Sequence, residues 1–108
     1  MKIEFVNPIF HEGINTTCRR GDKYGDLRPR GTLALCRSGS SVPVTTATVH
    51  SVLYIRFMDI RDQDIQHEHD PHCRYVNGLF AEMQKCYPGF QQDELVTLIN
   101  FMPDTVQP

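Results

Sequence analysis

The stretch GINTTCRRGDKYGDLRPRGTLALCR, residues 13–37, carries the features from which the fold and the function of this chain can be argued. It holds four of the seven glycines and six of the eleven lysines and arginines within 25 positions. Glycine permits backbone turns that other residues disfavour, and clustered basic side chains attract anions. The stretch is therefore predicted to form a cationic surface made of two short strands joined by a long loop.

The whole chain has the composition of an ordinary globular domain. Of its 108 residues, 40% are hydrophobic and 22% are charged, values close to those of soluble domains. The length predicts one domain, residues 1–103, followed by a polar tail, residues 104–108. No apolar stretch reaches the roughly 18–20 residues of a membrane span, and MKIEFVNPIF lacks the apolar core of a signal peptide. We expect a cytoplasmic protein with no membrane partner.

Charge is distributed unevenly along the chain. The net charge is −2, yet residues 1–37 carry seven basic and four acidic side chains, whereas residues 38–108 carry four basic and nine acidic ones. This asymmetry favours an anion-binding surface in the N-terminal part. The alternative is a solvated cationic loop whose basic side chains pair partly with Asp22 and Asp26.

The four cysteines form no C-x-x-C pair. We therefore expect reduced thiols rather than disulfides. Cys36 and Cys86 fall on apolar faces of a predicted strand and a predicted helix, and we expect both to be buried in the core. The sequence indicates no cofactor.

Hydrophobic periodicity predicts an α+β fold in which strands predominate. The predicted strands cover residues 2–6, 16–20, 32–36, 44–58 and 95–102, and the predicted helices cover residues 8–12, 59–64 and 74–86. Residues 44–58 form either one bent strand or two strands that meet at a bulge, with Val49 and Leu53 toward the core. Strands of mixed length with helices between them predict a small, closed or nearly closed β-barrel with helices packed at its ends.

The order of these elements, together with the residues within them, resembles the ASCH domain family, a branch of the PUA-like β-barrel fold. Gly13 ends a short predicted helix, and Thr16-Thr17 and Arg19-Arg20 follow it after two residues. A strand with the pattern Gly31-x-Leu33-x-Leu35 comes next, and the chain closes with Tyr87-Pro88-Gly89-Phe90 and a strand containing Asn100-Phe101. The resemblance extends over residues 3–102.

The resemblance implies a cleft between the barrel and its helices, lined by the Gly-x-x-Thr-x-x-x-Arg pattern of residues 13–20. It also implies RNA or a modified nucleoside as the partner. Some small bacterial members of the family deacetylate N4-acetylcytidine with a lysine, a threonine and a glutamate. Here the lysine position is Asn15 and the second threonine position is Cys18, while Arg20 matches the family's arginine. The region that matches the glutamate lies around residues 68–72 and includes Glu68.

These departures leave binding and catalysis open. Asn15 cannot transfer a proton as an amidase lysine does, which favours a binding module. The alternative is an amidohydrolase acting on N4-acetylcytidine or a related nucleoside, with Cys18 and Glu68 as candidate catalytic residues. Arginine suits phosphate, and tyrosine offers a face on which bases stack. The candidate nucleic-acid or phosphate-binding residues are Asn15, Thr16, Thr17, Arg19, Arg20, Lys23, Tyr24, Arg28 and Arg30.

The segment HEHDPHC, residues 67–73, contains residue types that bind zinc. One short segment rarely supplies ligands that converge from several directions, so we expect a solvated loop and no metal site. Asp70, before Pro71, is expected to cap the helix that follows. A third interpretation of the function is a protein-interaction domain that uses the acidic face formed by residues 59–70.

Overall fold

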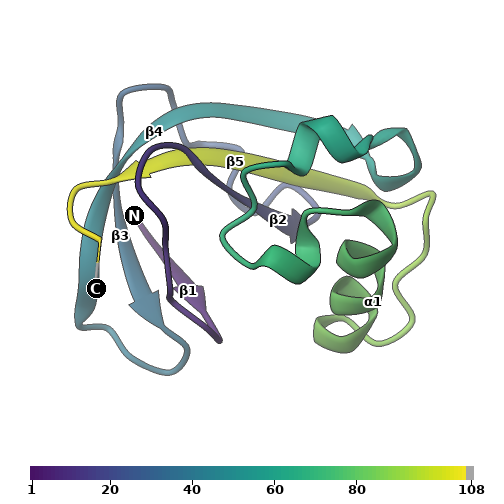
Figure 1. The fold of residues 1–108 in the computed structure, drawn as a ribbon, viewed down its shortest axis with the longest axis horizontal. Coiled ribbons are helices and arrows are strands. Elements are labelled where there is room, and N and C mark those ends of the chain that lie inside the picture. Colours follow the sequence, from purple (N-terminus) through teal and green to yellow (C-terminus); the bar gives the residue numbers. More distant parts are fainter. Residues whose placement is uncertain (107–108) are drawn as a thin grey trace.

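The computed structural model describes residues 1–106, which form one five-stranded sheet with helical segments gathered at one end of its long strands (Figure 1). The strands are β1 (Lys2–Phe5), β2 (Asn15–Arg20), β3 (Thr32–Arg37), β4 (Pro43–Arg56) and β5 (Leu95–Pro103). The helical segments are three 3₁₀ helices, η1 (Phe57–Asp59), η2 (Asp62–Ile65) and η3 (Pro71–Cys73), and one α-helix, α1 (Val76–Cys86). The predicted α+β class is confirmed.

The sheet is open, so the predicted barrel is not confirmed. Its strand order is β1-β3-β4-β5-β2, with β1 parallel to β3 and all other neighbours antiparallel. Closure would require β1 to pair with the free edge of β2, but another segment occupies part of that edge. The backbone N–H of Thr16 donates to the His67 carbonyl at 2.9 Å, and the His69 N–H donates to the Thr16 carbonyl at 3.2 Å. A gap therefore remains between the two edge strands.

The long strand β4 is one continuous strand, as in the first of the two alternatives expected, and it contains the bulge expected in the second. Its register with β5 passes from Val49 directly to Ser51, so His50 is the extra residue. Because a bulge reverses the alternation of side chains, residues before and after it change faces. Val49 is buried as predicted, whereas Leu53 is 45% exposed, contrary to prediction.

Two hydrophobic cores cover the two faces of the sheet. One contains Phe5, Phe10 and Phe101, and the other joins β5 to the helical end through residues such as Phe57 and Met83. The helix predicted for residues 8–12 is absent, because Phe10 enters the first core, with its ring centroid 5.1 Å from that of Phe5. This packing requires an irregular, extended backbone.

The helix α1 begins two residues later than predicted and keeps its apolar face. Leu79 and Met83 on this face are buried. The Asp62 carboxylate accepts a hydrogen bond from the Val76 N–H at 2.8 Å and so caps the first turn from a distant segment. Asp70 caps as predicted, but it caps η3, because it accepts from the His72 N–H at 3.0 Å.

Candidate functional site

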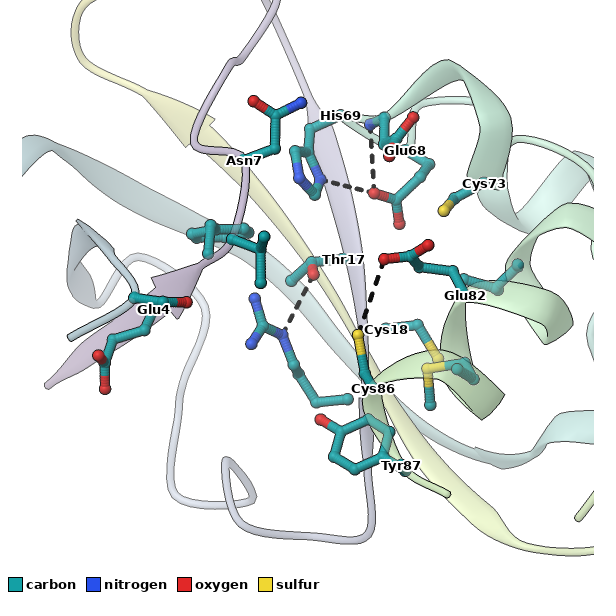
Figure 2. Close-up of a pocket in the computed structure, with 17 residues that line it drawn as sticks. Glu4, Asn7, Thr17, Cys18, Glu68, His69, Cys73, Glu82, Cys86 and Tyr87 are labelled. Carbon is teal, nitrogen blue, oxygen red and sulfur yellow. Dashed lines mark hydrogen bonds and ion pairs between the residues drawn. The ribbon is translucent and has the colours of Figure 1, made fainter. Parts of the chain in front are cut away.

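A cavity of about 290 Å³ opens where β1 and β2 fail to meet, and we call it the cleft (Figure 2). Its walls come from residues 4–7 of β1 and the turn after it, residues 17–19 of β2, residues 68–70, the face of α1 from Leu79 to Cys86, and Tyr87 directly after this helix. Segments far apart in the sequence therefore supply one site. Cys18 and Glu68, the two candidate catalytic residues, both line it.

Glu68 is the most deeply buried acid of the cleft, with only 2% of the residue exposed. Its backbone is held by a bridge to Thr16 of β2, which places its side chain in the cavity. One carboxylate oxygen, Oε1, lies 2.5 Å from Nδ1 of His69 and accepts a hydrogen bond from the Asp70 N–H at 3.3 Å. This contact is an ion pair when the imidazole is protonated, and Nδ1 has no hydrogen-bond partner among residues 1–106.

His69 is the aromatic wall behind this acid. Its ring lies 5.0 Å from the ring of Phe5 and 5.6 Å from that of Phe10, measured between centroids. The imidazole is thereby wedged between the first core and the cavity. Glu68 thus has a fixed neighbour on one side and the open cleft on the other.

The thiols of the cleft are held in their neutral form. Burial, reinforced by the negative charge of Glu68, raises the pKa of Cys18 far above its ordinary value, and the opposing effect of Arg19 is smaller. Burial and the same carboxylate also raise the pKa of Cys73 to about 12. Because the thiolate is the nucleophilic form, this environment disfavours Cys18 as a nucleophile at neutral pH.

Arg19 is the cation of the cleft. Its Nε donates to the hydroxyl of Thr17 at 3.3 Å, and its guanidinium carbon lies 4.7 Å from the centroid of the Phe5 ring. A guanidinium over an aromatic face is attracted to the ring electrons, so the side chain has a defined position. Thr17 and Arg19 thus line the cleft together, as two of the predicted binding residues.

Carboxylates outnumber cations in the cleft. Glu4, Glu68, Asp70 and Glu82 line it, against the single arginine Arg19. A carboxylate accepts hydrogen bonds and repels phosphate. The interior therefore suits a neutral or cationic group that carries N–H donors, and an anion is favoured only near Arg19.

Asn15 and Thr16 do not line the cleft, although both belong to the predicted binding set. Asn15 is fully buried, and its side-chain amide donates to the carbonyls of His11 at 2.7 Å and Gly13 at 3.2 Å. Thr16 is 1% exposed, and its hydroxyl donates to Asn100 at 2.5 Å. The two side chains hold the turn before β2 and the pairing of β2 with β5.

The other predicted binding residues lie along the loop after β2 rather than in the cleft. Arg20 forms an ion pair with Glu94, with 2.7 Å between Nε and Oε1. Tyr24 is only 8% exposed and packs in the first core, with the amino group of Lys23 5.6 Å from its ring centroid. Arg28 and Arg30 are exposed on the same loop. Within residues 1–106, no basic side chain of this loop pairs with Asp22 or Asp26, so the expected alternative pairing is not seen.

Most carboxylates of the acidic segment, residues 59–70, form contacts within the protein. The carboxylates of Asp62, Asp64 and Asp70 each accept from a backbone N–H, and Glu68 points into the cleft. Among the described residues, no three His, Cys, Asp or Glu side chains are grouped so as to hold a metal ion. No helix of residues 1–106 is long and apolar enough to cross a membrane.

Several cleft residues were missing from the sequence prediction. Glu82 and Tyr87 line the cavity, and Glu82 accepts a weak hydrogen bond from the Cys86 thiol at 3.7 Å. Cys86 is exposed, which corrects the expectation that it is buried, whereas Cys36 is fully buried as predicted. The helical spacing of Glu82 and Cys86, one turn apart, was the available signal, because it places them on the same side of α1.

Comparisons with known proteins agree on the fold. No protein-family model matches the chain, and no curated protein has a matching sequence. Solved structures of similar fold include the ASCH domain from Lactobacillus crispatus JV V101, with a TM-score of 0.54, 12% sequence identity, and coverage of 82% of this chain and 63% of that one. Protein EF3133 from Enterococcus faecalis V583, of the DUF984 family, has a TM-score of 0.54 and 16% identity, with coverage of 86% and 65%.

This chain thus spans somewhat less than two thirds of each of those proteins. Identities this low show a shared fold and no more. The chain has an ASCH-like α+β fold, as the resemblance implied.

Proposed function

We propose that the cleft binds one nucleoside, either free or as an unstacked residue of single-stranded RNA. The observation that carries this proposal is the buried Glu68 carboxylate that faces a cavity of about 290 Å³. Pockets for small molecules have volumes of about 300–1,000 Å³, so the cleft suits a ligand at the small end of that range. The ASCH-like fold supports a nucleic-acid component as the ligand.

The lining indicates how such a ligand would be recognised. Proteins read unstacked bases through hydrogen bonds to their edges and through stacking on aromatic rings. Glu68 and Glu82 would accept hydrogen bonds from an amino group of the base, and Tyr87 offers an aromatic ring. Arg19 would serve the ribose or a phosphate at the side of the cleft near Phe5.

Binding is favoured over hydrolysis of the N4-acetylcytidine type. The residue at the family's lysine position, Asn15, lies outside the cavity with its amide engaged by backbone carbonyls. The thiol of Cys18 stays protonated because of its raised pKa. Of the two candidate catalytic residues, Cys18 and Glu68, only Glu68 then remains as a possible base. Recognition by a protein partner and a cytoplasmic location stay predictions from the sequence.

The test is a titration with cytidine, uridine, cytidine 5′-monophosphate and N4-acetylcytidine, followed by amide chemical shifts. We expect shifts on residues 17–19 and 68–70, with cytidine and its monophosphate binding more tightly than uridine, which lacks the amino group. The Glu68→Gln variant should weaken cytidine binding by roughly 10- to 150-fold, the equivalent of a hydrogen bond to a charged group.

The exposed Glu12→Gln change, outside the cleft, is the matched control and should leave the affinity unchanged. Shifts confined to other surfaces, or equal binding by wild type and Glu68→Gln, would contradict the proposal. Conversion of N4-acetylcytidine to cytidine during the titration would replace binding by hydrolysis as the function.

A further inference from the structure

A second groove, of about 530 Å³, lies between the loop of residues 21–31 and the strands β4 and β5. Tyr54 of β4, Thr97 of β5, and Arg28 and Pro29 of the loop line it, together with Asp22. None of these residues lines the cleft. The groove is lined by part of the glycine- and arginine-rich stretch, residues 13–37. Nucleoside binding in the cleft gives no role to this part of the stretch.

We propose that this groove binds a base and a phosphate of single-stranded RNA that extends from the nucleoside in the cleft. The proposal deepens the proposed function, because it makes RNA rather than a free nucleoside the full ligand. It rests on three observations: an exposed aromatic ring, an arginine held in place without an acidic partner, and a sheet register that places the groove two strands away from the cleft.

Tyr54 supplies the exposed ring. It is 49% exposed and lies near the C-terminal end of β4, past the residues that pair with β3 and opposite Thr97 of β5. Within residues 1–106 its hydroxyl forms no side-chain hydrogen bond, so the ring is not tied to another protein group through that atom. Aromatic side chains on a sheet are common stacking platforms for single-stranded nucleic acid.

Arg28 supplies a fixed positive charge. Its Nη1 donates to the carbonyl of Gly25 at 2.8 Å and to that of Leu27 at 3.1 Å, which holds the guanidinium against the loop. No carboxylate among residues 1–106 forms an ion pair with it. The remaining N–H groups of its fork are therefore available for a phosphate. Asp22, the acid of the groove, can accept from a base amino group or a ribose 2′-hydroxyl.

The register of the sheet fixes the position of the groove relative to the cleft. Thr97 pairs with Tyr54 on one side and with Arg19 on the other, so the three side chains share one face in a row across β4, β5 and β2. Strands are about 4.8 Å apart, which puts Arg19 and Tyr54 roughly 10 Å apart. The loop covers the middle of this row, because Thr97 is 1% exposed and its hydroxyl donates to the Gly21 carbonyl at 2.6 Å. Figure 1 shows the three strands side by side.

The experiment measures the affinity for a fluorescein-labelled, eight-nucleotide single-stranded RNA of mixed sequence by fluorescence anisotropy. Tyr54→Ala should weaken binding by roughly five- to 150-fold, the effect of losing one stacked base. Tyr54→Phe, which keeps the ring, should bind like wild type. Arg28→Gln should weaken binding and lower the slope of log affinity against log salt by about 0.7, as expected for one lost phosphate contact on a single strand.

Tyr75→Ala is the matched control, because Tyr75 is 66% exposed and lies in neither cavity. Cytidine affinity and the thermal unfolding midpoint are measured for every variant. Weaker RNA binding by Tyr54→Ala, with cytidine affinity retained, supports the proposal. An unchanged RNA affinity of a folded Tyr54→Ala protein, or no RNA binding by wild type, overturns it.

The two proposals fail separately in this design. Wild type that binds RNA in a Tyr54-dependent manner but does not bind cytidine supports the groove and contradicts nucleoside binding in the cleft. Wild type that binds cytidine but not RNA contradicts the groove alone.

Discussion

At the scale of single residues, Gly78 is unfavourable for the helix but is required by the close packing of α1 against η3. Helix propensity alone says that Gly78→Ala should stabilise α1 by about 1 kcal/mol. However, a Cβ at this position would lie 1.9 Å from the backbone oxygen of His72, so the segment of η3 would have to move. We expect Gly78→Ala to lower the free energy of unfolding by about 1–3 kcal/mol, as overpacking does, measured by urea denaturation.

The control for this change is Asn77→Ala, on the exposed face of the same helix, which should be neutral or slightly stabilising. A Gly78→Ala protein more stable than wild type would mean that propensity outweighs the close approach of α1 to η3.

At the scale of elements, an ion pair joins the end of β2 to the turn before β5. The Arg20 guanidinium and the Gln91 N–H both donate to the Glu94 carboxylate, at 2.7 Å each. The backbone hydrogen bond from Gln91, followed by the bond from Arg20, lowers the pKa of Glu94 below its ordinary 4.5. A carboxylate whose pKa is lower in the folded state than in the unfolded state stabilises the fold at pH values above its unfolded-state pKa. This stabilisation is lost as the pH falls through the folded-state pKa.

We therefore expect wild type to exceed Glu94→Gln in stability at pH 6–7, and the difference to shrink as the pH falls below 4.5. Urea denaturation of both proteins between pH 3 and 7 measures it. The matched control is Asp93→Asn, one residue away. A difference in the free energy of unfolding between wild type and Glu94→Gln that grows as the pH falls would contradict the prediction.

At the scale of the whole molecule, the cysteines report on both the global fold and the cleft. Cys18, Cys36 and Cys73 are buried, whereas Cys86 is exposed at the rim of the cleft. We expect iodoacetamide at pH 7.5 to modify Cys86 first, and the other three only at the rate of unfolding. Pulsed labelling with mass spectrometry checks this order, and Cys86→Ser should remove the fast phase.

The same labelling connects the thiols to function. Saturating cytidine should slow the modification of Cys86, because the proposed ligand covers its side of the cleft. Fast modification of Cys18 in the native protein would contradict both its burial and its raised pKa.

Much of the fold and part of the site could be predicted from the sequence. The strands predicted for residues 32–36 and 95–102 and the apolar face of α1 could be identified because side-chain periodicity is a local property of the chain. The length of β4 predicted either one bent strand or two strands that meet at a bulge, and the structure combines one strand with a bulge. Cys18 and Glu68 were proposed from the family resemblance, and the structure brings them into one cavity.

Long-range pairing decided the rest. Residues 67–69 occupy the edge of β2 beside Thr16, about 50 positions away in the chain, and this leaves the sheet open and creates the cleft. No local pattern reveals which segment takes a strand edge, because backbone hydrogen bonds are the same for every residue type.

The tertiary structure also sorted the basic stretch that the sequence treated as one surface. Arg19 enters the cleft, Arg20 pairs with Glu94, and Arg28 lines the second groove. The sequence by itself determined that these basic side chains are clustered and that they belong to one strand and the loop after it. Only the fold decided where each one points, because successive side chains of a strand face opposite sides and a loop has no period.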